Sequence, residues 1–298
     1  TDKSFSPVQS KEQGVVSFNS DGFTKGTNAN ITGVDENIVA WTFQKAPGYF
    51  DIVKYDGDGG VQNIPHQLGS KPGMIITKGI DQATNWNVYH HTLGAAQFLM
   101  LDSTNKAASG AYWNNTEPTA SEFTVGSNGT NMSGKQFIAY LFADTPGVFK
   151  CWTYQCTGAS GNEVDCGFKP QWVLIRSSNA SNNWLICDES RPGNLVPNLT
   201  NAESGTKQTT FTDNGFEFTG GGGSYNGANN TYIYMAIAEP PAARSLTQEE
   251  YAEQALKFAT YQNRKEVACG NMAEQQRDDH IQHMADLGYE LNDILKYL

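Results

Sequence analysis

The sequence has no long hydrophobic run and no excess of basic residues. No stretch approaches the roughly 18 consecutive apolar residues of a membrane span, so we expect no membrane insertion. The 298 residues carry 20 Lys+Arg against 31 Asp+Glu, a formal net charge of −11, and nucleic-acid phosphates would repel such a protein. No apolar segment follows a basic start, so we expect no secretory signal, and the initial Thr1 indicates a processed chain or a fragment.

Cysteines are few and irregularly spaced. The sequence contains five, at Cys151, Cys156, Cys166, Cys187 and Cys269, without any CxxC pair. The spacing therefore gives no zinc-binding pattern. One disulfide among the four central cysteines is compatible with the sequence, but buried free thiols are the favoured interpretation.

Glycine and short β-type runs are abundant instead. There are 30 glycines, and runs such as FDIVKYDG, GMIITKG, WNVYH, QFLML and FIAYLFA alternate with Asp-Gly, Gly-Gly and Asn-Gly turns. Such runs and turns are typical of hairpin-connected strands. We predict a mainly β fold of tandem antiparallel β-sandwich repeats, followed by a C-terminal α-helical segment.

The sequence repeats itself. PGYFDIVKYDG, from Pro47, returns 99 residues later as PGVFKCWTYQC, and LGSKPGMII returns as CGFKPQWVL. SGKQFIAYLFAD corresponds in the same way to NNTYIYMAIAE. We therefore define repeat 1 as residues 47–145 and repeat 2 as residues 146–240, each predicted to form a β-sandwich.

A partial copy precedes the two repeats. FNSDGF matches the later FTDNGF, and NIVAWTFQKAPG matches FIAYLFADTPG, so residues 17–46 resemble the back half of a third repeat behind an N-terminal arm, residues 1–16. Half a repeat leaves strand edges and half a core exposed. Either the array continues upstream in a longer precursor, or a neighbouring chain completes the half.

Residues 241–298 have a different character. They are rich in charge and contain no proline after Pro241, and Thr247 and Glu250 have capping-box spacing. We predict helices over about 248–268 and from about 272 to the end. The second helix carries a coiled-coil seam that we assign to oligomerisation, formed by His280, Met284, Leu287, Leu291, Ile294 and Leu298. A helical hairpin folded on itself is an equally weighted alternative.

From NIVAWTFQ to FIAYLFAD, the chain resembles a repeat domain of tail-fibre and other virion proteins of tailed bacteriophages, particularly those of marine bacteria and cyanobacteria. The resemblance covers residues 17–240, is strongest in repeat 1, and weakens in repeat 2, where YHHTLG becomes CDESRPG. It implies a location in the virion and a non-enzymatic tail fibre or fibre-like appendage that contacts the host surface. It also implies a homotrimer, with other virion proteins and a host cell-surface glycan as partners.

The sequence leaves two other functions open. One is a capsid decoration or knob protein without receptor binding, and the other is a polysaccharide-degrading tailspike. Binding to intact host cells would separate the fibre from the decoration protein, and release of soluble sugar from host capsule would identify the tailspike.

The sequence gives no positive evidence for catalysis or for a cofactor. GTNMSGKQ, residues 129–136, resembles a phosphate-binding loop, but it lacks the final Ser/Thr and precedes a strand. His66, His90 and His91 could hold a metal only with a carboxylate such as Asp51 or Asp81, and repeat 2 has no histidine at the matching positions. We therefore predict neither a catalytic nor a metal site.

Pairs of acidic residues give no better evidence for catalysis. Asp188 and Glu189 are adjacent, which in a strand places their side chains on opposite faces, and Asp56 and Asp58 lie in a turn. No Ser/His/Asp arrangement stands out.

Aromatic residues near loops are the best candidates for ligand contact. Trp86 and Trp184 occupy matching positions in the two repeats, which favours a role in the core. Tyr112, Trp113 and Tyr225 have no such explanation, and sugar rings stack well on aromatic faces. We predict these three residues as a glycan-contact set.

Overall fold

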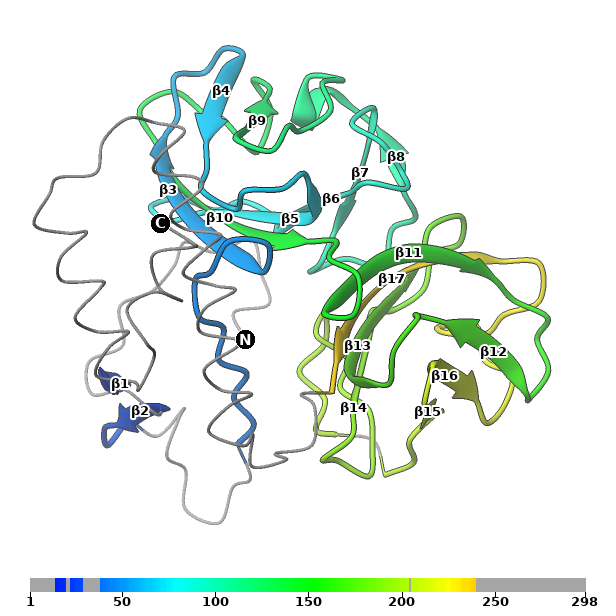
Figure 1. Cartoon of the computed structure of the whole chain (residues 1–298). Coiled ribbons are helices and arrows are strands. Elements are labelled where there is room, and N and C mark those ends of the chain that lie inside the picture. The colour runs from blue at the N-terminus through cyan, green and yellow to red at the C-terminus, as the bar shows by residue number, and fades with distance from the viewer. Residues whose placement is uncertain (1–13, 20–21, 29–37, 204, 240–298) are drawn as a thin grey trace, which may run out of the picture. The chain divides into compact units, whose positions relative to one another are not determined.

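The computed structural model describes residues 14–19, 22–28, 38–203 and 205–239, and the chain divides into the units 1–239 and 240–298 (Figure 1). All that follows concerns the first unit. The C-terminal helices and the seam from His280 to Leu298 lie outside the described residues, as does most of the N-terminal arm. Within the described part, no helix is long and apolar enough to cross a membrane.

The described residues form several antiparallel sheets, so the predicted mainly β fold is confirmed. In repeat 1 the larger sheet has the order β3-β10-β5-β6-β7-β8, and β4 pairs with β9 in a second sheet. The strands are β3 (Phe50–Asp56), β4 (Gln62–Pro65), β5 (Pro72–Gly79), β6 (Asn87–His90), β7 (Gln97–Met100), β8 (Ala108–Ser109), β9 (Glu122–Val125) and β10 (Gln136–Ala143). A 3-10 helix, η1 (Ala111–Trp113), precedes β9.

Repeat 2 has the corresponding strand order. Its larger sheet is β11-β17-β13-β14, and its smaller sheet is β12-β16-β15 (Figure 1). The strands are β11 (Phe149–Gln155), β12 (Asn162–Asp165), β13 (Pro170–Ser177), β14 (Leu185–Asp188), β15 (Thr209–Thr212), β16 (Gly215–Phe218) and β17 (Thr231–Ala238). In both repeats the last long strand, β10 or β17, pairs on its two edges with the first and third strands.

Each repeat has a core between its two sheets. In repeat 1, Ile75 and Leu141 of the larger sheet pack with Phe123 of the smaller one. In repeat 2, Val173 and Phe216 lie in the equivalent core. Because side chains alternate along a strand, every second residue of β5 and β13 points away from these cores.

Those outward-pointing residues form a third cluster that both repeats share. It joins Met74 and Ile76 of β5 to Trp172 and Leu174 of β13, together with Trp184. The larger sheets are therefore covered on both faces, which explains why all eight residues of β5 are buried. A strand buried on both faces shows a continuous apolar run instead of alternation.

The partial copy is only partly formed as strands. β1 (Val15–Asn19) and β2 (Gly22–Lys25) pair with Phe18 opposite Phe23, the register in which β15 and β16 place Phe211 opposite Phe216. Phe18 is 81% exposed.

Residues 38–45 match β10 and β17 in sequence but belong to no strand. Strands equivalent to β3 and β5, which flank β10 in repeat 1, are missing beside this segment among the described residues. Its backbone therefore has no ladder to join, although its local sequence favours a strand.

Candidate functional site

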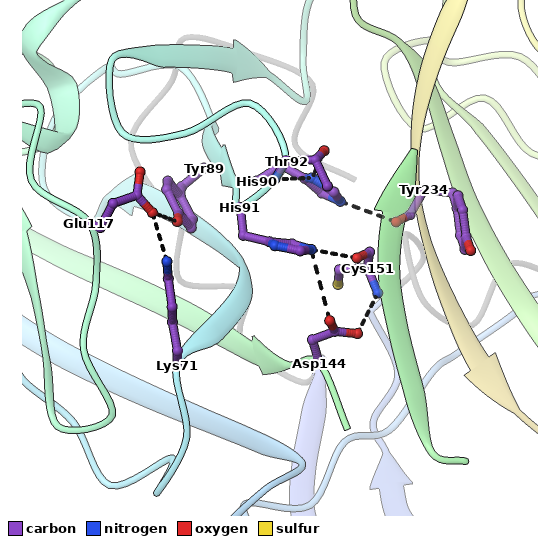
Figure 2. Close-up of polar contacts among 9 residues, drawn as sticks. All are labelled: Lys71, Tyr89, His90, His91, Thr92, Glu117, Asp144, Cys151 and Tyr234. Carbon is purple, nitrogen blue, oxygen red and sulfur yellow. Dashed lines mark hydrogen bonds and ion pairs between the residues drawn. The ribbon is translucent and has the colours of Figure 1, made fainter. Parts of the chain in front are cut away.

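Polar side chains gather where the two repeats meet, and His90 is fully buried there (Figure 2). The backbone N–H of Thr92 donates to Nδ1 of His90, so the ring proton lies on Nε2, which donates to the carbonyl of Tyr234 at 3.2 Å. Burial, reinforced by the neighbouring His91, lowers the pKa of His90 to about 3. His90 is therefore a neutral group that joins β6 to β17.

His91 makes a second link to repeat 2. Its Nε2 lies 2.5 Å from the carbonyl oxygen of Cys151 and 3.9 Å from Oδ2 of Asp144. Oδ1 of Asp144 accepts the backbone N–H of Cys151 at 3.1 Å, as Figure 2 shows. Burial raises the pKa of the Cys151 thiol, so this sulfur is a poor nucleophile. The contacts of His91 and Asp144 with the Cys151 backbone therefore serve to hold β11 against repeat 1.

A second group in Figure 2 is centred on Glu117. Its Oε2 accepts bonds from the hydroxyl of Tyr89 at 2.7 Å and from Nζ of Lys71 at 2.9 Å, and Oε1 accepts the N–H of Ala95. Burial favours the neutral acid, but these bonds outweigh it and hold the pKa of Glu117 below its usual value. The group anchors the loop before β9 to the larger sheet.

The predicted glycan-contact set is not brought together. Trp113 is only 1% exposed and packs against Tyr89 in the core of repeat 1, so the structure removes it from the set. η1 turns its indole inward and leaves Tyr112 half-buried against Phe98. Tyr225 is half-buried in the other repeat, and no described contact joins it to Tyr112.

Tyr225 takes part in a hydrogen bond that recurs at equivalent positions of the two repeats. In repeat 1, Tyr55 donates to the carbonyl of Thr130 at 2.6 Å, and in repeat 2, Tyr154 donates to the carbonyl of Tyr225 at 2.8 Å. The hydroxyl of Tyr225 also donates to Gln208. The aromatic ring is thus held within the fold of repeat 2.

The phosphate-loop-like segment 129–136 serves the same corner of repeat 1. Asn131 is fully buried, and its amide donates to Oδ1 of Asp58 and to the carbonyl of Gly60. The amide group of Asn131 is therefore already hydrogen-bonded within the protein. The segment therefore closes a turn before β10 and shows no feature of a phosphate-binding loop.

Other candidate residues have separate partners. Asp51 forms an ion pair with Lys45 at 2.8 Å, and Asp81 accepts the N–H of Gln136. His66 is buried, with Nδ1 accepting the N–H of Leu68. In the part of the chain that is described, no group of three or more His, Cys, Asp and Glu side chains is arranged to hold a metal ion.

Cys151, Cys156, Cys166 and Cys187 are all free and buried, as favoured from the sequence. Burial raises the pKa of Cys156 and Cys166 to about 12 and that of Cys187 to about 11. None of these thiols has the thiolate character that a nucleophile needs.

The sequence did not predict a cleft of about 1320 Å³ beside residues 38–43. Its other wall comes from repeat 2 and includes Trp172, Asp188, Arg191 and Glu203. A signal was present, because CDESRPG, where repeat 2 departs from repeat 1, contains both Asp188 and Arg191. A second cleft, of about 570 Å³, is almost wholly apolar, with Phe50, Trp86 and Tyr140 in its walls.

A family model described as a domain of unknown function, DUF7483, matches residues 2–241. Because the match takes in most of the 298 residues, the chain belongs to this family. No curated protein and no solved structure matches the chain. The match includes the partial copy and both repeats, and it ends where the charged segment 241–298 begins.

Proposed function

We propose that this member of the DUF7483 family is a non-enzymatic structural protein of a bacteriophage virion, a tail fibre or fibre-like appendage. In this proposal its two repeats are tandem β-sandwiches. The observation that carries it is that the two repeats have corresponding strand orders and pack through the same face of the larger sheet. Tandem units of this kind suit an elongated or surface-forming part of a particle.

Buried polar residues at matching positions support a structural role. Lys78 in repeat 1 lies 5.9 Å from the ring of Trp86, and Arg176 in repeat 2 lies 5.7 Å from the ring of Trp184. Both cations lie almost fully inside the protein, where Lys78 donates to the carbonyl of Thr84. Such groups hold loops against sheets instead of facing solvent for chemistry.

Exposed apolar side chains in the partial copy support assembly. Phe18 on the β1–β2 hairpin is 81% exposed, and Ile38 and Val39 are also exposed on a segment without strand pairing. Contact with another copy would bury these groups, and burial of apolar area favours association. We propose a homotrimer in which the 241–298 segment, through its His280–Leu298 seam, contributes to oligomerisation.

The proposed location is an external appendage, where the protein would contact other virion proteins and a host cell-surface glycan. Tyr112 and Tyr225 remain in the proposed contact set, each in its own repeat. The acidic composition, a net charge of −11, is compatible with a protein that does not bind the packaged nucleic acid.

Purified phage particles test this function. Gold-labelled antibodies against residues 47–239 should decorate an external tail appendage of gradient-purified virions in electron micrographs. Label confined to the capsid would indicate a capsid decoration protein and not a tail fibre. Absence of label from the particles would refute a virion role. Release of soluble sugar from host capsule by the purified protein would contradict the non-enzymatic assignment.

A further inference from the structure

The 1320 Å³ cleft beside residues 38–43 has two tryptophans in its walls. Trp41 comes from the partial copy and Trp172 from β13, and their ring centroids lie 6.2 Å apart at 72°. Trp41 is 37% exposed, so part of its ring is open to solvent in the cleft. The cleft thus offers an accessible aromatic surface beside a second, buried indole.

Charged groups lie next to this aromatic pair. Nε of Arg191 donates to Oδ2 of Asp188 at 2.6 Å, and Nη1 of Arg191 lies 3.8 Å from Oε2 of Glu203. Oε1 of Glu203 accepts the N–H of Gly193 at 2.8 Å. The guanidinium carbon of Arg191 lies 5.3 Å from the ring centroid of Trp41, so aromatic and charged groups form one continuous wall.

Among the described residues, several buried polar atoms of this wall have no hydrogen-bond partner. They are Nε1 of Trp172, Oδ1 of Asp188, and Nη1 and Nη2 of Arg191. A buried donor or acceptor without a partner costs about 1–3 kcal/mol, so polar groups arriving in the cleft would be stabilised by pairing with them. The wall offers both donors and an acceptor, which is the complement of a hydroxyl group.

The ring of Trp41 lies over Arg191, so a ligand must shift that ring to reach the guanidinium. Among the described residues no strand pairs with residues 38–44, so a shift of the Trp41 ring would break no strand hydrogen bonds.

The charges and the size narrow the class of ligand. One guanidinium lies between two carboxylates, so an anionic ligand would meet a wall of net negative charge. Arg191 already offsets part of the charge of these two carboxylates, which weakens the case for a simple cation. The volume exceeds the roughly 300–1000 Å³ typical of small-molecule sites and so suits several linked rings.

We propose that this cleft binds a neutral oligosaccharide. Trp41 contacts the apolar face of a sugar ring, and Asp188, Arg191 and Nε1 of Trp172 bond to its hydroxyls. The proposal that the cleft binds sugar is argued from the residues of the cleft. The proposal that this sugar belongs to a host cell rests on the proposed function. The smaller apolar cleft lacks this set of donors and is not assigned to a sugar.

The test uses the full chain and a panel of neutral hexasaccharides of glucose, mannose, galactose and N-acetylglucosamine, with hexagalacturonate as the charged comparison. Calorimetry should detect a neutral member with a Kd below about 1 mM. Trp41→Ala should weaken that binding by about tenfold or more, and Trp41→Phe should retain most of it. Trp152→Ala is the matched control, because Trp152 is 47% exposed but lies outside the cleft.

Three results would overturn the proposal: no panel member binds, only the charged hexasaccharide binds, or Trp41→Ala and Trp152→Ala weaken binding equally. Far-UV circular dichroism of each variant distinguishes lost binding from lost folding. A cleft that fails this test while antibody still labels the tail would leave the virion role intact. Sugar binding by a protein absent from particles would leave the cleft assignment intact.

Discussion

Asn131 and Asn226 are both fully buried and lie at matching corners of the two repeats. Asn131 donates to Asp58 and Gly60 and also accepts the N–H of Asp58 at 2.9 Å. Asn226 donates to the carbonyls of Ala159 and Gly220. Each asparagine thus ties together loops that are far apart in the sequence.

Replacing either asparagine by alanine should destabilise the protein. Because the substitution leaves buried partners unpaired, Asn131→Ala should lower the free energy of unfolding by about 1–3 kcal/mol, and Asn226→Ala by somewhat less, since it makes fewer bonds. Urea titration measures both. Asn201→Ala, at an exposed position, is the control and should change stability by less than about 0.5 kcal/mol. Equal stability of Asn131→Ala and the control would contradict this account of the corner.

His90 predicts a pH dependence. Its pKa is about 3 in the folded protein, because of burial, against 6.5 for an exposed histidine. Between pH 6.5 and about 3, His90 is protonated in the unfolded chain but stays neutral in the folded protein. Protonation therefore favours the unfolded chain, and the folded protein loses stability as the pH falls through this range. This one group should change the unfolding equilibrium by about tenfold per pH unit in that window.

His90→Gln isolates the effect from that of other titrating groups. The variant should be less stable than the wild type above pH 6.5, and the difference should shrink as the pH falls to about 4, because only the wild type loses the His90 contribution. Urea midpoints across this range check it. A constant difference between the two proteins would show that His90 titrates normally.

At the scale of elements, Gly215 allows β16 to approach its neighbour. An added Cβ at Gly215 would lie 1.9 Å from the carbonyl oxygen of Val164 in β12, while the same atom at Gly220 would meet nothing within 4 Å. The close approach in the smaller sheet of repeat 2 therefore depends on the missing side chain.

Gly215→Ala should cost about 1–3 kcal/mol, because the strand must shift to relieve the clash. Gly220→Ala is the matched control in the same repeat, with an expected change below about 0.5 kcal/mol. Thermal or urea unfolding of the two variants gives the comparison. Similar stability in both would mean that β12 and β16 tolerate a wider separation than the structure shows.

Strand positions were largely predictable because local sequence and tertiary burial agree. The runs FDIVKYDG, GMIITKG and FIAYLFA became β3, β5 and β10, all with β-branched or aromatic residues on buried faces. Residues 38–45 have a similar local sequence without a strand, because pairing needs neighbours that the local sequence does not encode. The same limit explains β4, QNIP, which lacks a strong β run and is defined by its pairing with β9.

The candidate sites were harder to predict than the strands. Tyr112 and Trp113 are adjacent, yet η1 exposes them differently, and no periodicity in the sequence indicates which ring turns inward. The cleft brings Trp41, Trp172, Arg191 and Glu203 together from separate segments. Such a site arises from packing between repeats, which a single sequence without contacts does not reveal.

On the scale of the whole molecule, the proposed fibre depends on how copies of the chain associate. The two repeats bury apolar side chains against each other in a shared cluster. The β1–β2 hairpin and residues 38–45 instead expose apolar side chains that no strand of the described residues covers. The 241–298 segment carries the predicted oligomerisation seam. Both features lead to the proposed homotrimer of a fibre.

The solution mass from light scattering tests this claim most directly, on the full chain and on a chain ending at Arg244. We expect a mass of three times 32.6 kDa for the full chain and the mass of a monomer after truncation. A trimer that survives truncation would show that the β units, and not the 241–298 segment, hold the copies together. A full chain that remains monomeric would contradict the free-standing fibre.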